Sequence, residues 1–207
     1  MADTGADRLP VLHGLRLKGF VQVDALTDLI GVSPQRCETE LSVAEGDGLV
    51  VHRGGRLTGW MLTPAGRAEV AKLLAAELDA SGARAAIERE YGRFLGVNGA
   101  FLALCTDWQM RDELTLNDHA DSTYDAAVIA RLGVLDDQVQ PVCADLGAAL
   151  RRFGGYSSRL TRARDKIEQG DMDWFTKPMI DSYHTVWFEL HEDLLATLSI
   201  ERSQEVG

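Results

Sequence analysis

The fold is decided by the stretch DALTDLIGVSPQRCETELSVAEGDGLVVHRGGRLTGWMLTPAGR, residues 24–67. It begins with two short segments of helical periodicity joined by a tight Gly-Val-Ser turn, and Pro34 suits the first position of the second segment. Apolar side chains recur at spacings of three and four, so each segment has one apolar face. They are Leu26, Leu29 and Ile30 in the first segment and Cys37, Leu41 and Ala44 in the second. The pattern predicts two helices joined by a turn.

A β-hairpin and a further helix are predicted after these two helices. Residues 49–53 and 56–62 have strand character on either side of Gly54-Gly55, which indicates a two-residue turn. Thr63 and Pro64 are typical of a helix cap and a first helical residue. Helix, turn, helix, hairpin and helix is the element order of a winged helix-turn-helix, whose second helix usually enters the DNA major groove.

The hairpin and the helix after it resemble those of MarR- and PadR-type regulators. The run Leu62-Thr63-Pro64-Ala65-Gly66-Arg67 fits the Leu-Thr-x-x-Gly-Arg pattern that often closes the wing in those families. The resemblance covers roughly residues 1–80 and implies a winged helix-turn-helix and a DNA-binding function. Winged helices also serve as protein-binding modules, so both functions stay open.

A second resemblance rests on two short stretches, Leu15–Phe20 and Ser182–Leu195. They are similar to segments found beside the phosphohistidine swivel domains of phosphoenolpyruvate-utilising proteins. This similarity implies an accessory module that acts on a partner enzyme and has no catalytic activity of its own.

The chain is expected to be mainly α-helical and to contain two domains. Residues 1–80 form the winged helix-turn-helix domain, and Ser81-Gly82 interrupts the helix that leaves it. Residues 81–207 are expected to form an antiparallel helical bundle for dimerisation, effector sensing or partner binding. Its predicted helices cover residues 84–108, 124–153, 156–168 and 173–198, with a capping box at Ser122–Asp125.

The formal net charge of −11 weakens a simple DNA-binding interpretation, because binding to phosphates needs local positive charge. Glu38, Glu40 and Glu45 lie on the predicted recognition helix and would repel phosphates unless they turn away. The candidate DNA-binding residues are Gln35 and Arg36 at the start of that helix and Arg53 and Arg56 beside the hairpin turn.

Other classes of protein are disfavoured by composition and motifs. The apolar surroundings of Cys37, Cys105 and Cys143 indicate buried free thiols in a reducing cytoplasm. The acidic residues 1–8 do not resemble a signal peptide, and no apolar run is long enough to span a membrane. Phosphate-binding, hydrolase and metalloprotease motifs are absent, so we expect no catalytic residue and no cofactor.

One helical face in the second domain is basic. Arg159, Arg162 and Lys166 follow each other at spacings of three and four. They are candidates for a patch that binds an anion or an acidic partner. The alternative is a solvated face whose charges pair with acidic neighbours such as Asp145 or Glu168.

Aromatic and histidine side chains near the end of the chain suggest an effector pocket or plain core packing. Phe101 and Trp108 of the first bundle helix are expected to face them. The candidate pocket residues are Trp108, Tyr183, His184, Trp187, Phe188 and His191. A metal is not expected, because His184 and His191 would lie about 10 Å apart along a helix, too far for one zinc ion even with His119 nearby.

Taken together, these patterns predict a cytoplasmic, homodimeric transcriptional regulator that binds DNA and responds to a small-molecule effector. The alternative is a non-catalytic protein-interaction module that acts on a partner enzyme. A positive surface around the four candidate DNA-binding residues would distinguish the two.

Overall fold

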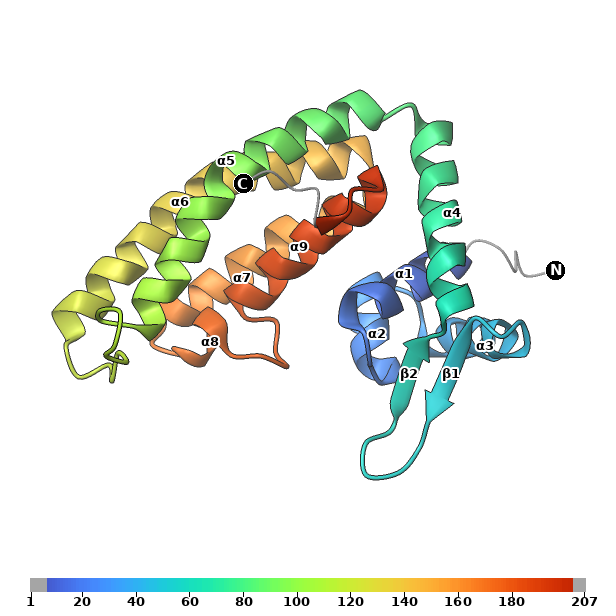
Figure 1. The fold of residues 1–207 in the computed structure, drawn as a ribbon, viewed down its shortest axis with the longest axis horizontal. Helices are drawn as coiled ribbons and strands as arrows, with labels where there is room; N and C mark the ends of the chain where they lie inside the picture. The colour runs from blue at the N-terminus through green and yellow to red at the C-terminus, as the bar shows by residue number, and fades with distance from the viewer. Residues whose placement is uncertain (1–6, 203–207) are drawn as a thin grey trace. The chain divides into compact units, whose positions relative to one another are not determined.

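The computed structural model describes residues 7–202 and is mainly α-helical, with one two-stranded antiparallel sheet (Figure 1). It divides into two compact units. Unit 1 comprises the described residues up to Gly82 together with Leu195–Glu201, and unit 2 comprises Ala83–Leu194 and Arg202. Residues 195–201, which the sequence assigns to the second domain, thus belong to unit 1. Residues 1–6, most of the acidic start in which no signal peptide was expected, lie outside the described residues.

Unit 1 combines short helices with the hairpin. In chain order its elements are α1 (Arg8–Lys18), α2 (Val23–Ile30), α3 (Pro34–Gly46), β1 (Val50–Arg53), β2 (Gly59–Leu62) and α4 (Pro64–Ser81). All of them contribute side chains to one apolar core, which also contains Ala196. The two helices, the hairpin and the following helix therefore lie where the sequence predicted them.

Helix α1 was not predicted from the sequence. It buries Val11, Leu12 and Leu15 completely. Gly14 in its middle permits a close approach to α2, because a Cβ atom there would lie 2.5 Å from Cδ1 of Leu26. The glycine that weakens the helical pattern in the sequence is therefore the residue that lets the two helices pack.

The predicted two-residue hairpin turn is wrong. Val50 pairs with Leu62 and Arg53 pairs with Gly59, so residues 54–58 form a five-residue loop. The predicted turn would have placed Arg53 opposite Arg56, and like charges in directly opposed positions destabilise a sheet. The observed register instead buries Val50 and Leu62 together on the core side.

The Thr-x-x-Gly part of the predicted run has a geometric explanation at the start of α4. The Thr63 hydroxyl accepts a hydrogen bond from the backbone N–H of Gly66 at 3.1 Å and donates to the carbonyl oxygen of Gly48 at 2.7 Å. A Cβ atom at residue 66 would lie 2.0 Å from the carbonyl oxygen of Leu49. Only glycine lets the first turn of α4 lie this close to the strand.

Unit 2 is built from long helices. Its elements are α5 (Arg84–Gln109), α6 (Ser122–Ala149), the short 3₁₀ helix η1 (Arg151–Gly155), α7 (Tyr156–Glu168), α8 (Asp173–Thr176) and α9 (Tyr183–Leu198), whose last residues belong to unit 1. Figure 1 shows α5 and α6 running side by side in opposite directions. None of the described helices combines the length and the apolarity needed to cross a membrane.

Three boundaries in unit 2 differ from the prediction. The N-cap of α6 is Asp121, not Ser122, because the Asp121 carboxylate accepts hydrogen bonds from two backbone N–H groups of the first turn. This helix ends at Ala149, before the predicted end at Phe153, and η1 follows. The predicted helix over residues 173–198 is two helices, α8 and α9.

Candidate functional site

The outer face of α3 carries two of the candidate DNA-binding residues. Gln35 and Arg36 are both exposed near the start of the helix. Arg36 is not free, because its guanidinium donates two hydrogen bonds of 2.6 Å to the two carboxylate oxygens of Asp7. This paired geometry fixes the guanidinium and neutralises its charge. Asp7 therefore occupies the Nε and Nη2 donors of Arg36, and its negative charge opposes contact of this guanidinium with a phosphate.

The three glutamates of α3 have different environments. Glu40 is buried and lies 3.7 Å from Arg8, and burial raises its pKa although the charge of Arg8 opposes that shift. Glu38 and Glu45 are exposed. All three were expected to repel DNA phosphates unless they turned away, and only Glu40 is buried. The exposed face of α3 therefore carries no net positive charge of its own.

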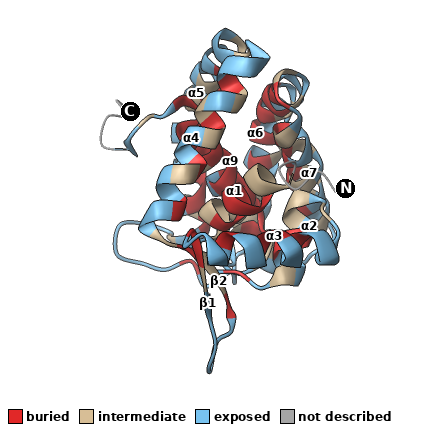
Figure 2. Ribbon diagram, turned by 90° about the vertical axis from the view of Figure 1, so that its right-hand side faces the viewer, coloured by how far each residue is buried: buried red, intermediate tan, exposed pale blue. Residues whose placement is uncertain are grey.

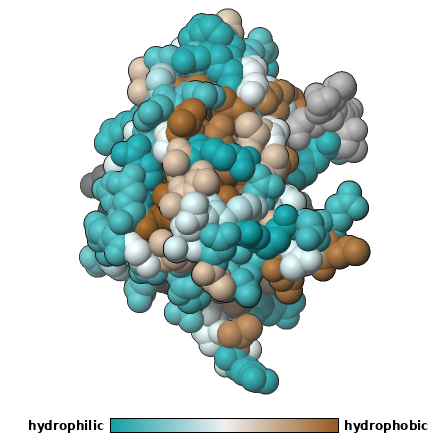
Figure 3. Space-filling view, turned by 90° about the vertical axis from the view of Figure 1, so that its left-hand side faces the viewer, coloured by the Kyte–Doolittle hydropathy of each residue, from teal (hydrophilic) through white to brown (hydrophobic). Residues whose placement is uncertain are grey.

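The end of the hairpin is exposed, as Figure 2 shows, and every residue from 52 to 58 is exposed. Arg53 and Arg56 are both exposed there, and within residues 7–202 neither forms an ion pair with a carboxylate. The tip projects at the bottom of Figure 3 and ends in hydrophilic atoms. Among the described residues, no ion pair compensates the positive charge of these two arginines.

The predicted basic face of α7 is not a single patch, because Arg159 is enclosed. Its Nε and Nη2 atoms donate to the two carboxylate oxygens of Asp181 at 3.0 Å, and Nη2 also donates to Glu189 at 2.6 Å. Burial lowers the pKa of Arg159, but the hydrogen bonds and charges of Asp181 and Glu189 raise it by more than burial lowers it. The pKa therefore lies above its ordinary value, and the residue stays charged. Arg159 holds α7 against α9.

The other two residues of that predicted face have different environments. The guanidinium of Arg162 lies 5.4 Å from the ring centroid of Trp174, and its side chain is exposed. Lys166 is half-buried at the end of α7. Only Arg162 and Lys166 therefore remain as candidates for contact with an anion or an acidic partner.

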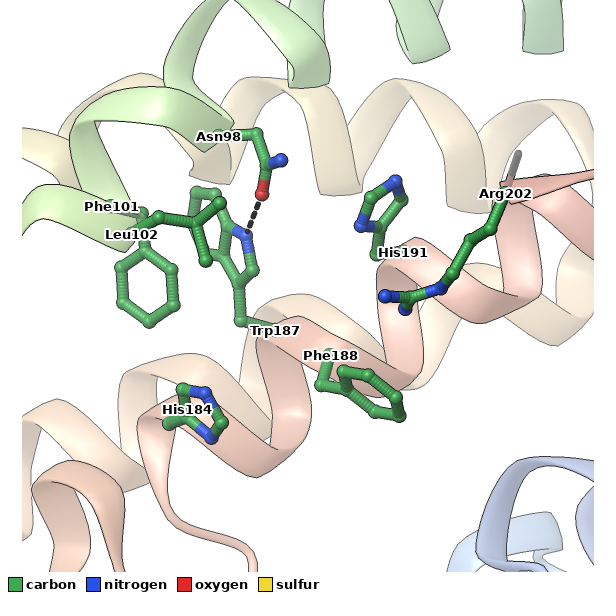
Figure 4. A pocket seen from close by; sticks show the side chains of 8 residues that line it. All are labelled: Asn98, Phe101, Leu102, His184, Trp187, Phe188, His191 and Arg202. Atoms are coloured by element: carbon green, nitrogen blue, oxygen red, sulfur yellow. Dashed lines mark hydrogen bonds between the residues drawn. The ribbon is translucent and has the colours of Figure 1, made fainter. Parts of the chain in front are cut away.

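A pocket of about 150 Å³ lies between α5 and α9 of unit 2 (Figure 4). It is lined by Asn98, Phe101, Leu102, His184, Trp187, Phe188, His191 and Arg202. Four of the six predicted pocket residues, all on α9, are among them, and the facing Phe101 is there as expected. Phe101 and Trp187 form its floor, with ring centroids 4.2 Å apart.

Two predicted pocket residues lie elsewhere in unit 2. Trp108 stacks on Phe175 with parallel rings 4.4 Å apart. Tyr183 is fully buried, and its hydroxyl donates a hydrogen bond of 2.9 Å to Asp136. Helical spacing placed both near the pocket, but their rings fill the core.

Three lining residues were not predicted, namely Asn98, Leu102 and Arg202. The side-chain oxygen of Asn98 accepts a 2.9 Å hydrogen bond from the indole N–H of Trp187. The guanidinium of Arg202 lies 4.8 Å from the ring centroid of Phe188. Leu102 belongs to the apolar pattern of α5, which was a usable signal. For Asn98 and Arg202 the sequence offered no such signal. Asn98 is far from α9 in the sequence, and Arg202 follows the end of α9.

The pocket holds little uncompensated charge. Burial lowers the pKa of His184 below its ordinary value of 6.5, so its imidazole is neutral at pH 7. Arg202 donates a 2.6 Å hydrogen bond to Glu192. Across residues 7–202, no three histidine, cysteine, aspartate or glutamate side chains are grouped so that they could hold a metal ion.

The three cysteines are buried and free. Burial raises the pKa of the Cys37 thiol to about 11 and that of the Cys105 and Cys143 thiols to about 12. These thiols are protonated at neutral pH and are poor nucleophiles.

Comparison of the chain with protein-family models, with curated proteins and with solved structures finds no match. The function is therefore inferred from the residues and geometry described above.

Proposed function

We propose that the chain is a DNA-binding transcriptional regulator in which unit 1 acts as a winged helix-turn-helix. The order α2, turn, α3, hairpin and α4 supports this proposal, since α3 contacts α2 and β1 and leaves one face exposed. In such a domain α3 enters the major groove and the hairpin lies against the backbone. Two protomers would present two α3 helices to the halves of a palindromic site. Unit 2 would then supply dimer contacts and effector binding.

One observation carries the proposal, namely the unpaired charge of Arg53 and Arg56 at an exposed hairpin end. Other exposed arginines such as Arg36 and Arg93 form ion pairs with carboxylates, whereas these two form none among the described residues. Two arginines on a projecting loop can bind phosphates or enter a minor groove without any rearrangement of the core.

Replacing Arg53 and Arg56 together with alanine is expected to weaken DNA binding to all sequences and to reduce its salt dependence. The slope of log K against log salt concentration is negative, and each lost phosphate contact reduces its magnitude by about 0.9. Between 50 and 200 mM salt, the affinity of the double variant should therefore fall about tenfold less than that of the unaltered protein. Electrophoretic shifts of the chain's own upstream DNA at both salt concentrations measure this.

The matched control is Arg84→Ala with Arg151→Ala, which removes two exposed charges from unit 2. Its salt slope should equal that of the unaltered protein. A protein that binds no genomic fragment specifically at low salt would remove the basis of the proposal.

The Asp7–Arg36 ion pair leads to a second expectation. Replacing Asp7 with asparagine should raise DNA affinity about two- to fivefold, because the exposed ion pair contributes up to about 1 kcal/mol that is lost when Arg36 turns its Nε and Nη2 donors to DNA. The same substitution in an Arg36→Ala background should have a smaller effect. An equal gain in both backgrounds would show that Asp7 acts only through its general negative charge.

A protein-interaction module is the second candidate, and the acidity of α3 favours it. Glu38 and Glu45 remain exposed while Arg36 is neutralised. Beside the hairpin, the rings of His52 and Trp60, with centroids 4.8 Å apart and planes tilted by 46°, line a hollow of about 260 Å³. A partner enzyme would use these surfaces, and loss of its binding on Trp60→Ala, with DNA binding absent, would support this candidate.

A further inference from the structure

The pocket of unit 2 has the size and walls of a site for a single small ring. Its volume of about 150 Å³ is close to that of an engineered apolar cavity that binds benzene. The floor consists of the buried rings of Phe101 and Trp187. The rim is apolar but open, since Leu102 and Phe188 are 53% and 45% exposed. A planar ligand could stack on the floor and cover both rim side chains.

Two polar groups at this site have unused hydrogen-bonding capacity. The Asn98 side chain uses its oxygen for Trp187, and its NH₂ group has no acceptor among the described residues. Figure 4 shows this nitrogen on the side of Asn98 away from the indole. Neither ring nitrogen of His184 has a hydrogen-bond partner within residues 7–202. A hydroxyl group can both accept from an amide and bond to an imidazole.

The charges at the pocket disfavour an ionic ligand. Arg202 is the only permanently charged residue among the described lining residues, and it already pairs with Glu192. Its guanidinium also lies against the ring of Phe188. A carboxylate on the aromatic floor would lose hydration without gaining a free cation, which is costly.

We propose that this pocket binds a small, uncharged, planar ring that carries a hydroxyl group, a ligand of the size and chemistry of phenol. The inference deepens the proposed regulator, because such a ligand would be its effector. Binding itself does not depend on the DNA-binding proposal and can be measured without DNA.

The test uses the full chain and follows the indole N–H signal of Trp187 by NMR during titration at pH 7.5. Phenol should shift this signal with a dissociation constant on the order of 1 mM, as expected for a ligand of so few atoms. Benzoate should bind at least tenfold more weakly because of its charge. Cyclohexanol, which keeps the hydroxyl but is not planar, should bind about two- to tenfold more weakly.

Two variants separate the parts of the site. His184→Phe should weaken phenol binding about two- to tenfold and leave toluene binding unchanged, because only the hydrogen bond is lost. Leu102→Ala should weaken binding of both ligands. Val134→Ala on α6 is the control, since Val134 is 58% exposed and lies outside the pocket.

Several outcomes would overturn the inference. They are benzoate binding as tightly as phenol, a Trp187 signal that phenol does not shift, and a phenol affinity that His184→Phe leaves unchanged.

Sedimentation tests the other occupant, a second copy of the chain. If Leu102→Ala lowers the assembled mass and phenol does not bind, the rim is a subunit interface. A protein that binds phenol but no DNA would contradict only the proposed function.

Discussion

Replacing Arg159 with alanine is expected to lower the free energy of unfolding by about 3–5 kcal/mol. The side chain of Arg159 is only 15% exposed, and that of its partner Glu189 is 3% exposed. Removing the guanidinium leaves Glu189 as a buried carboxylate that has lost its 2.6 Å ion-pair partner. Loss of one partner of a buried pair is far more costly than loss of an exposed one. Urea denaturation of the full chain, followed by circular dichroism, measures the difference.

Arg162→Ala is the matched control for this experiment. It removes the same charge from the same helix, but Arg162 is exposed, lies over the ring of Trp174 and forms no ion pair among the described residues. Its expected cost is about 0.5–1 kcal/mol. Equal stabilities of the two variants would show that the ion pairs of Arg159 contribute no more than surface charges, which contradicts its role as a clamp between α7 and α9.

Arg159 also shows what helical periodicity can and cannot predict. The spacing of Arg159, Arg162 and Lys166 predicts helix α7, whose ends agree with the predicted range. Periodicity does not say which element covers each part of a helix surface. The acidic partners of Arg159 come from 22 and 30 residues later in the chain. A pattern within α7 alone could not reveal that its first arginine is enclosed.

The hairpin illustrates a similar limit in unit 1. The strand residues and the following helix were predictable, because Thr63 and Pro64 mark a helix start strongly. The register was not, since the Gly54-Gly55 pair is a strong local signal for a two-residue turn. Burial of Val50 opposite Leu62 determines the observed pairing, and such a tertiary preference overrides a local turn signal.

The pocket was predicted in part for a comparable reason. Residues of α9 share a face at helical spacing, so His184, Trp187 and Phe188 could be grouped from the sequence. Asn98 accepts a hydrogen bond from the indole of Trp187, although the two residues are 89 positions apart in the sequence. Only the packing of α5 against α9 brings the two side chains together.

Replacing Trp187 with alanine is expected to cost about 3–5 kcal/mol of unfolding free energy. Trp187 is 2% exposed, and its ring lies 4.2 Å from that of Phe101 and 5.0 Å from that of Phe94. The truncation removes these contacts and leaves a cavity beneath the pocket, and the amide of Asn98 loses its indole partner. Urea denaturation gives the cost, and thermal denaturation with and without phenol reports whether the variant still gains stability from the ligand.

Two further variants separate packing from ligand contact at this position. Trp187→Phe keeps a ring on Phe101 and loses the hydrogen bond to Asn98, so its cost should be about 1–2 kcal/mol. Phe188→Ala removes a side chain that is 45% exposed and should cost less than either Trp187 variant while still weakening phenol binding. A Trp187→Ala protein that is as stable as the unaltered chain would show that the indole belongs to the pocket alone and not to the core of unit 2.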